Sequence, residues 1–289
     1  MNERTSVTSA WFISTRPKTL LLSIFPFALG TLLAIPATII INWPLMLFAM
    51  LSAFCIQIGT NLINDAFDVQ RGADTKSRLG PKRGVQNGAL SVNQVYRAGL
   101  FCFALALLFG IPLVVEGGLI ILLLLVISVI CGYIYTGGPV PLAYHGLGEL
   151  FVTLFFGLAA TLAAYFFQTG EVNVHAVLLG LQLGLLATLP IAINNLRDIV
   201  DDAKVNKRTL AVRFGETCAR IEITALALTP FLIGQQWLPL LALPIAYKII
   251  HGVWTVEPSK AYNRFLGMSM VLYLAFCVLW SLTFLLRLS

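Results

Sequence analysis

Long stretches without a charged side chain dominate this 289-residue sequence. No Asp, Glu, Lys or Arg occurs between Lys18 and Asp65, or between Glu116 and Glu149. A helix needs about 20 apolar residues to cross a bilayer, so the first interval is long enough for two crossings. Apolar residues make up 58% of the chain and charged residues only 11%, whereas soluble domains carry about 25% charged residues. These features predict an all-α, polytopic membrane protein.

Polar, glycine and proline breaks divide the chain into nine predicted transmembrane helices within a single domain, residues 1–289. Their predicted ranges are 19–36, 44–64, 95–115, 118–135, 147–167, 174–196, 218–234, 237–252 and 265–286. The alternative is one long helix over 220–250, which gives eight. With eight helices, Lys248, Lys260 and Arg264 would lie outside, against the preference of basic residues for the cytoplasmic side. We therefore expect nine, with the N-terminus in the cytoplasm.

The net charge of +6 does not predict a nucleic-acid partner, because the basic residues lie between apolar helices rather than in one patch. The five cysteines are scattered without a Cys-x-x-Cys pair, so they indicate neither a disulfide framework nor a zinc site. Two long polar loops follow the predicted helices 44–64 and 174–196, and both face the cytoplasm in this topology. Chemistry is therefore expected at the cytoplasmic face.

Two acidic segments stand at the cytoplasmic ends of predicted helices. Within each segment the polar side chains fall within roughly 100° of arc, on one face of a helix. The first set is Asn61, Asn64, Asp65 and Asp68, and the second is Asn194, Asp198, Asp201 and Asp202. Carboxylates gathered at a membrane border need compensating cations, and Mg²⁺ is bound by carboxylate oxygens together with substrate phosphates.

Basic residues follow each acidic segment directly. They are Arg71, Lys76, Arg78, Lys82 and Arg83 after the first, and Lys204, Lys207, Arg208 and Arg213 after the second. Such cations bind diphosphate oxygens and stabilise the charge of a leaving group. The matched pair of segments therefore predicts a metal-diphosphate site.

Tyr135, Tyr144 and Glu149 flank the uncharged loop 136–141. They fit a pocket for an aromatic substrate and equally fit anchors at the membrane interface, where tyrosine is common.

Asn61 with Asp65, and Asp198 with Asp202, match the Asn-x-x-x-Asp and Asp-x-x-x-Asp motifs of the UbiA superfamily of intramembrane polyprenyltransferases, which this sequence resembles. Within the superfamily it is most similar to the 1,4-dihydroxy-2-naphthoate polyprenyltransferases of menaquinone biosynthesis. The similarity recurs in segments 16–20, 64–74, 78–88, 135–149 and 194–210. Two positions depart from that pattern: Ala66 replaces a frequent tyrosine, and Asn206 replaces a usual glycine.

The resemblance implies a UbiA-type helical bundle in the inner (plasma) membrane of a bacterium, with its active site on the cytoplasmic side. It implies transfer of a polyprenyl group from polyprenyl diphosphate to 1,4-dihydroxy-2-naphthoate, with decarboxylation, to give demethylmenaquinol. Mg²⁺ is then expected at Asn61, Asp65, Asp68, Asp198 and Asp202, whose four carboxylates would be catalytic. The expected diphosphate contacts are Asn64, Arg71, Arg78, Arg83, Asn194 and Lys207. The expected acceptor contacts are Arg16, Lys18, Tyr135 and Glu149.

Several alternatives stay open from sequence alone. Arg16 and Lys18 fit diphosphate ligands, a counter-charge for the acceptor carboxylate, or membrane-interface anchors of the first helix. Another aromatic acceptor, such as 4-hydroxybenzoate or homogentisate, would keep the diphosphate chemistry. A cation transporter is the alternative outside enzymes, although its carboxylates should lie near the bilayer middle. Prenyl chain length and oligomeric state are not indicated.

Overall fold

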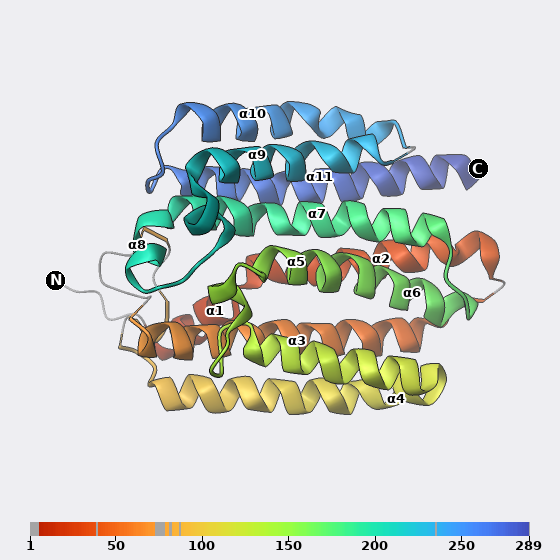
Figure 1. Ribbon diagram of the computed structural model, residues 1–289. Coiled ribbons are helices and arrows are strands. Elements are labelled where there is room, and N and C mark those ends of the chain that lie inside the picture. The colour runs from red at the N-terminus through yellow and green to blue at the C-terminus, as the bar shows by residue number, and fades with distance from the viewer. Residues whose placement is uncertain are drawn as a thin grey trace.

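The computed structural model describes residues 6–38, 40–72, 79–80, 83–86, 88–234 and 236–288. Every regular element within these ranges is helical (Figure 1). Helices satisfy their own backbone hydrogen bonds, which lipid cannot do for them. The predicted all-α class is therefore confirmed.

The elements follow one another as a series of long helices with short helical connections. In chain order they are α1 (Val7–Thr15), α2 (Pro17–Ala34), η1 (Ile35–Ala37), α3 (Trp43–Gln70), α4 (Val92–Ile134), η2 (Leu142–His145), α5 (Gly148–Thr153), the π-helical η3 (Leu154–Ala159), α6 (Ala160–Thr169), α7 (Val174–Arg197), α8 (Ile199–Lys204), α9 (Leu210–Leu232), η4 (Leu238–Ala242), α10 (Leu243–Thr255) and α11 (Tyr262–Leu288).

Seven helical segments are long and apolar enough to cross a membrane. One of them, α4, is two helices joined at Gly118, where φ is 63° and ψ is −150°. Glycine adopts this left-handed conformation without steric cost, so the chain reverses there. Dividing α4 gives eight segments, and α9 is the ninth; its charged residues, such as Arg220 and Glu222, lower its hydropathy. The described residues thus contain the predicted number of long helices.

Helix α7 lies at the centre of the bundle, between the α9–α11 group and the α2, α5 and α6 group (Figure 1). In its membrane-length window 67% of the residues are buried, against 17% for α4, whose apolar side chains face outward. Leu183, Leu186 and Ile193 of α7 are fully buried in the largest apolar cluster. α7 is therefore the central helix, on which α2, α5, α6, α9 and α11 pack.

The connections divide between the two ends of the bundle (Figure 1). The ends of α3 and α7, the starts of α4 and α9, and α8 lie at one end, where α1 also lies; we call this the polar end. The hairpin in α4, the α6–α7 connection and the C-terminus lie at the other end. Both acidic segments therefore lie at the same end, as the sequence predicts.

Three elements differ from the sequence prediction. Helix α1 was not expected, and it packs Ala10 against Leu62 of α3 and Val85 of the following loop. α8 is a separate short helix after α7. α9 begins at Leu210 instead of 218, but its backbone breaks at Gly215, where φ is 82°. The remaining predicted helices are present with ends shifted by a few residues.

Candidate active site

A cavity of about 830 Å³ opens at the polar end and extends into the bundle. Arg16, Asp68 and Lys207 line its polar part. Leu113 and Phe167 line its deep part, close to the hairpin of α4 and the end of α6 respectively. The cavity therefore joins a charged mouth to a long apolar interior.

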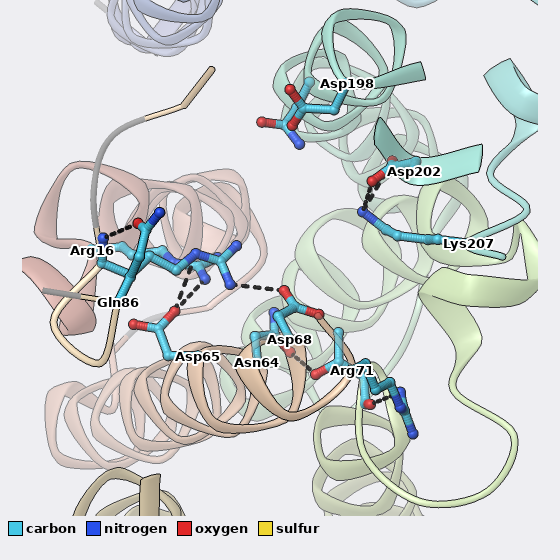
Figure 2. A network of polar contacts seen from close by, with 12 residues as sticks. Arg16, Asn64, Asp65, Asp68, Arg71, Gln86, Asp198, Asp202 and Lys207 are labelled. Carbon is cyan, nitrogen blue, oxygen red and sulfur yellow. Dashed lines mark hydrogen bonds and ion pairs between the residues drawn. The ribbon is translucent and has the colours of Figure 1, made fainter. Parts of the chain in front are cut away.

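Asp65, on the last turns of α3, is fully buried beneath two arginines (Figure 2). Its Oδ1 accepts a hydrogen bond from Arg16 Nη2 at 2.8 Å and lies 3.4 Å from Arg83 Nε. Its Oδ2 has no hydrogen-bond partner among the described residues. A buried carboxylate oxygen left unpaired is costly, and a bound cation would satisfy it.

Asp68 lies one turn further along α3, on the same face. Its Oδ2 binds Arg83 Nη1 at 2.7 Å, and its Oδ1 accepts a hydrogen bond from the Tyr144 hydroxyl at 3.1 Å. Burial disfavours the charge of Arg83, but Asp65 and Asp68 outweigh it and raise the pKa of this guanidinium. Arg83 therefore stays positively charged and bridges the two carboxylates.

Both arginines are carried by segments outside α3. Arg16 joins α1 to α2 in the left-handed region, with φ 53° and ψ 59°, which is unusual for a residue other than glycine. The loop that bears Arg83 packs on α1: a Cβ at Gly84 would lie 2.6 Å from Ser14 Oγ. Helix α1 and this loop thus hold the guanidinium groups over the end of α3.

A second cluster lies at the end of α7, organised by the fully buried Arg197. Its guanidinium contacts both oxygens of Asp198, at 2.7 and 2.6 Å. It also donates to the side-chain oxygens of Asn194 and Asn263, each at 2.6 Å. Asn263 in turn donates to the carbonyl of Leu79 at 2.9 Å. The sequence analysis did not identify Arg197 or Asn263, although Arg197 stands inside the predicted acidic segment.

Asp202, in the first turn of α8, pairs with Lys207 at 3.1 Å. Burial raises the pKa of the Asp202 carboxyl to about 6, although Lys207 acts in the opposite direction. The charge of Lys207 also acts on Asp68, so the two clusters are electrostatically connected. Figure 2 shows Asp65 and Asp68 on one side of the site and Asp198 and Asp202 on the other.

Arg71 faces away from the acidic clusters (Figure 2). Its guanidinium donates to the carbonyls of Thr136 and Gly138 and lies 4.9 Å from the ring centroid of Tyr144. Thr136 Oγ1 in turn donates to Asn64 Oδ1. Arg71 therefore fixes the loop between α4 and η2, and this geometry does not support its predicted contact with diphosphate. The predicted contact Arg78 lies outside the described residues.

The residues predicted for the acceptor divide into two groups. Arg16, Lys18 and Tyr135 line the cavity. Glu149 is buried behind it and accepts a hydrogen bond from Asn195 Nδ2 at 2.6 Å. Asn195 itself lines the cavity and was not singled out from sequence. Glu149 therefore does not line the cavity itself but holds the side chain of Asn195, which does.

The predicted metal ligands do not form one ready-made cluster. Among the described residues, no three His, Cys, Asp or Glu side chains are placed to hold a metal ion. Asn61 donates to the carbonyl of Thr15 at 3.2 Å, and each predicted carboxylate ligand contacts a basic side chain. The donors are nevertheless all oxygen, and Asp65 Oδ2 has no hydrogen-bond partner among the described residues. Such a set fits a hard cation such as Mg²⁺.

Comparison with known proteins agrees with this arrangement. The UbiA prenyltransferase family matches residues 23–271 of the chain. The 1,4-dihydroxy-2-naphthoate octaprenyltransferase of Haemophilus influenzae is 33% identical, over 90% of this chain and 91% of that protein. The enzyme of the same name from Escherichia coli is 36% identical, over 75% and 72%.

Solved structures show the same fold at lower sequence identity. A UbiA homologue from Archaeoglobus fulgidus, bound to DMAPP and Mg²⁺, superposes with a TM-score of 0.61 at 17% identity. The superposition covers 94% of this chain and 99% of that one. The matched family and the extent of the similarity to its members show that this chain belongs to the UbiA prenyltransferase family.

Proposed function

We propose that this protein transfers a polyprenyl group from polyprenyl diphosphate to 1,4-dihydroxy-2-naphthoate. The acceptor loses its carboxylate as CO₂, diphosphate leaves the donor, and demethylmenaquinol is formed. The observation that carries the proposal is the cavity, which is charged at its mouth and apolar inside. It suits a donor with an anionic head and a hydrocarbon tail. The acceptor follows from five relatives of 29–36% identity that are named for this reaction.

In the proposed site, Asp65, Asp68, Asp198 and Asp202, with Asn61, would hold Mg²⁺. Bound there, the metal supplies charge stabilisation at the diphosphate oxygens. Arg83 and Lys207, with Asn64 and Asn194, are the proposed contacts of the diphosphate from this chain. Their positive charges stabilise the negative charge that develops on the leaving group as the allylic C–O bond breaks.

The cavity walls supply the remaining requirements of the reaction. The apolar interior, which includes Phe27, Leu113 and Phe167, takes the prenyl chain and keeps water from the allylic cation. Tyr135 and Asn195 line the cavity and are the proposed contacts of the acceptor ring, with Glu149 behind Asn195. Lys18 lines the same cavity and is the proposed counter-charge for the acceptor carboxylate.

We place the polar end on the cytoplasmic side of a bacterial plasma membrane. Most of the described Lys and Arg residues lie in or next to the connections at this end, as the positive-inside preference requires. The donor tail and the product both dissolve in the bilayer, whereas the diphosphate needs an aqueous supply of metal. A site at this border meets both requirements.

The direct test uses purified protein in detergent with radiolabelled polyprenyl diphosphate, 1,4-dihydroxy-2-naphthoate, and either Mg²⁺ or EDTA. Mass spectrometry of the extracted lipid should show the decarboxylated prenyl-naphthoquinol with Mg²⁺ only. Product with 4-hydroxybenzoate or homogentisate instead would overturn the acceptor but keep the diphosphate chemistry. Unreacted donor with every acceptor would overturn the proposed enzyme function.

A further inference from the structure

Each proposed metal-binding carboxylate already has a cationic partner within the protein. Asp65 contacts Arg16 and Arg83, and Asp68 contacts Arg83. Asp198 pairs with Arg197, and Asp202 pairs with Lys207. Four carboxylates thus face four basic side chains, and the site is close to neutral without a metal.

The carboxylates of these pairs are shielded from water. The side chain of Asp65 is 0% exposed, that of Asp68 is 9% exposed and that of Asp198 is 14% exposed. A divalent cation added alone would leave two uncompensated positive charges in this environment, which is costly. A diphosphate added alone would draw the guanidinium groups and leave the carboxylates unpaired. Added together, the opposite charges of the two ligands largely cancel.

Arg16 and Arg83 are well placed to change partners. Both line the cavity, and their side chains are 29% and 12% exposed. Neither belongs to α3, so they can turn toward a ligand without moving the helix that carries Asp65 and Asp68. Arg197 differs, because its side chain is 0% exposed and is held by Asn194 and Asn263 as well as by Asp198.

We propose that Arg16 and Arg83 are exchangeable internal counter-ions, which occupy Asp65 and Asp68 until a metal and a diphosphate arrive together. The two guanidinium groups then pass to the diphosphate, and the two carboxylates become free for the metal. This inference rests on the proposed function, because it takes a prenyl diphosphate as the second ligand. Its consequence is that the protein alone binds divalent cations weakly, and that metal and diphosphate strengthen the binding of each other by the same factor.

The test measures binding of Mn²⁺, as a spectroscopic substitute for Mg²⁺, to purified metal-free protein by the electron paramagnetic resonance signal of free Mn²⁺. Arg83→Gln should bind Mn²⁺ alone about fivefold or more tightly than the wild type, a typical size for coupling between two ligands. Arg83→Lys keeps the charge and should bind as weakly as the wild type. Lys204→Gln is the matched control, because it removes a positive charge from exposed Lys204 on α8, outside the site.

A second titration adds farnesyl thiodiphosphate, a slowly reacting donor analogue. The wild type should then bind Mn²⁺ about fivefold or more tightly than without it, and Arg83→Gln should gain less. Equal Mn²⁺ affinity with and without the analogue, or no tighter binding of Mn²⁺ by Arg83→Gln, would overturn the proposal. Arg16→Gln repeats the test should Arg83→Gln fail to fold. Turnover is not needed for these titrations, so product formation by a wild type that shows no coupling would refute the exchange and leave the proposed function intact.

Discussion

Asp65 and Asp198 have equivalent places in the two clusters, each near the end of a long helix and each held by arginine. Asp65→Asn and Asp198→Asn should each lower the rate of product formation about 100-fold or more, the usual scale for loss of an electrostatic contact in a transition state. Both variants keep a polar side chain of the same shape, so we expect them to fold. Turnover and thermal unfolding of the purified variants in detergent measure the two effects.

Asp201 provides the matched control for these substitutions. It lies beside Asp202 on α8, but its side chain is 39% exposed and pairs with exposed Lys204. Asp201→Asn should therefore keep nearly wild-type turnover. Wild-type turnover in Asp65→Asn or Asp198→Asn would contradict the metal assignment, and an inactive Asp201→Asn would show that any charge loss at this end is harmful.

Arg71 shows that the role of an arginine cannot be assigned from its position in the sequence alone. Its place after the acidic segment suggests a diphosphate ligand, yet it binds loop carbonyls. Arg71→Met should destabilise the fold by about 2 kcal/mol, because charged hydrogen bonds to two carbonyls are lost. The expected result is a lower midpoint of thermal unfolding with unchanged affinity for farnesyl thiodiphosphate. Weaker binding of the analogue at an unchanged midpoint would restore the sequence interpretation.

The spacing of carboxylates along one helix is local information, and it was sufficient to select Asp65, Asp68, Asp198 and Asp202. Partners from distant segments were not predictable in this way. Tyr144 reaches Asp68 across 76 positions, and Asn263 reaches Arg197 across 66. Asn206 is a different case: it replaces a usual glycine and has φ 56°, a left-handed conformation that asparagine tolerates better than most residues.

At the scale of elements, hydropathy located the long helices because lipid requires long apolar runs. It did not reveal α1, which has only nine residues, four of them Ser or Thr. The loop of Arg83 packs on this helix, so an important part of the site depends on an element too short to be found as a membrane-spanning run. Close contacts between helices were also not predictable, since they depend on which glycines face a neighbour.

Gly157 of η3 is such a contact: a Cβ there would lie 2.3 Å from Gly184 Cα of α7. Because backbone atoms are in the way, Gly157→Ala should force η3 away from α7 and lower the midpoint of thermal unfolding by several degrees. Gly267→Ala on α11 is the control, since its Cβ would meet no atom within 4 Å. Equal midpoints for the two variants would show that η3 and α7 separate without cost.

At the scale of the whole molecule, the alternation of charge-free runs and basic loops was enough to place both acidic segments at one end. The cavity was not predictable, because its shape depends on how α1 to α7 and α11 pack around it. Which end faces the cytoplasm remains a prediction from the distribution of Lys and Arg. The orientation of the bundle fixes the side of the membrane on which every loop lies. One labelled position at each end therefore suffices to test the orientation.

Lys204 on α8 and Glu171, between α6 and α7, are exposed residues at the two ends. In a variant whose five native cysteines are replaced by serine or alanine, we expect Glu171→Cys to react with a membrane-impermeant maleimide added to intact bacterial spheroplasts. Lys204→Cys should react only after the membrane is permeabilised, because the polar end is predicted to face the cytoplasm. Labelling in denaturant confirms that each thiol is present and reactive. The reverse pattern would place the diphosphate site outside the cell, and equal labelling of both positions in intact spheroplasts would indicate mixed orientation.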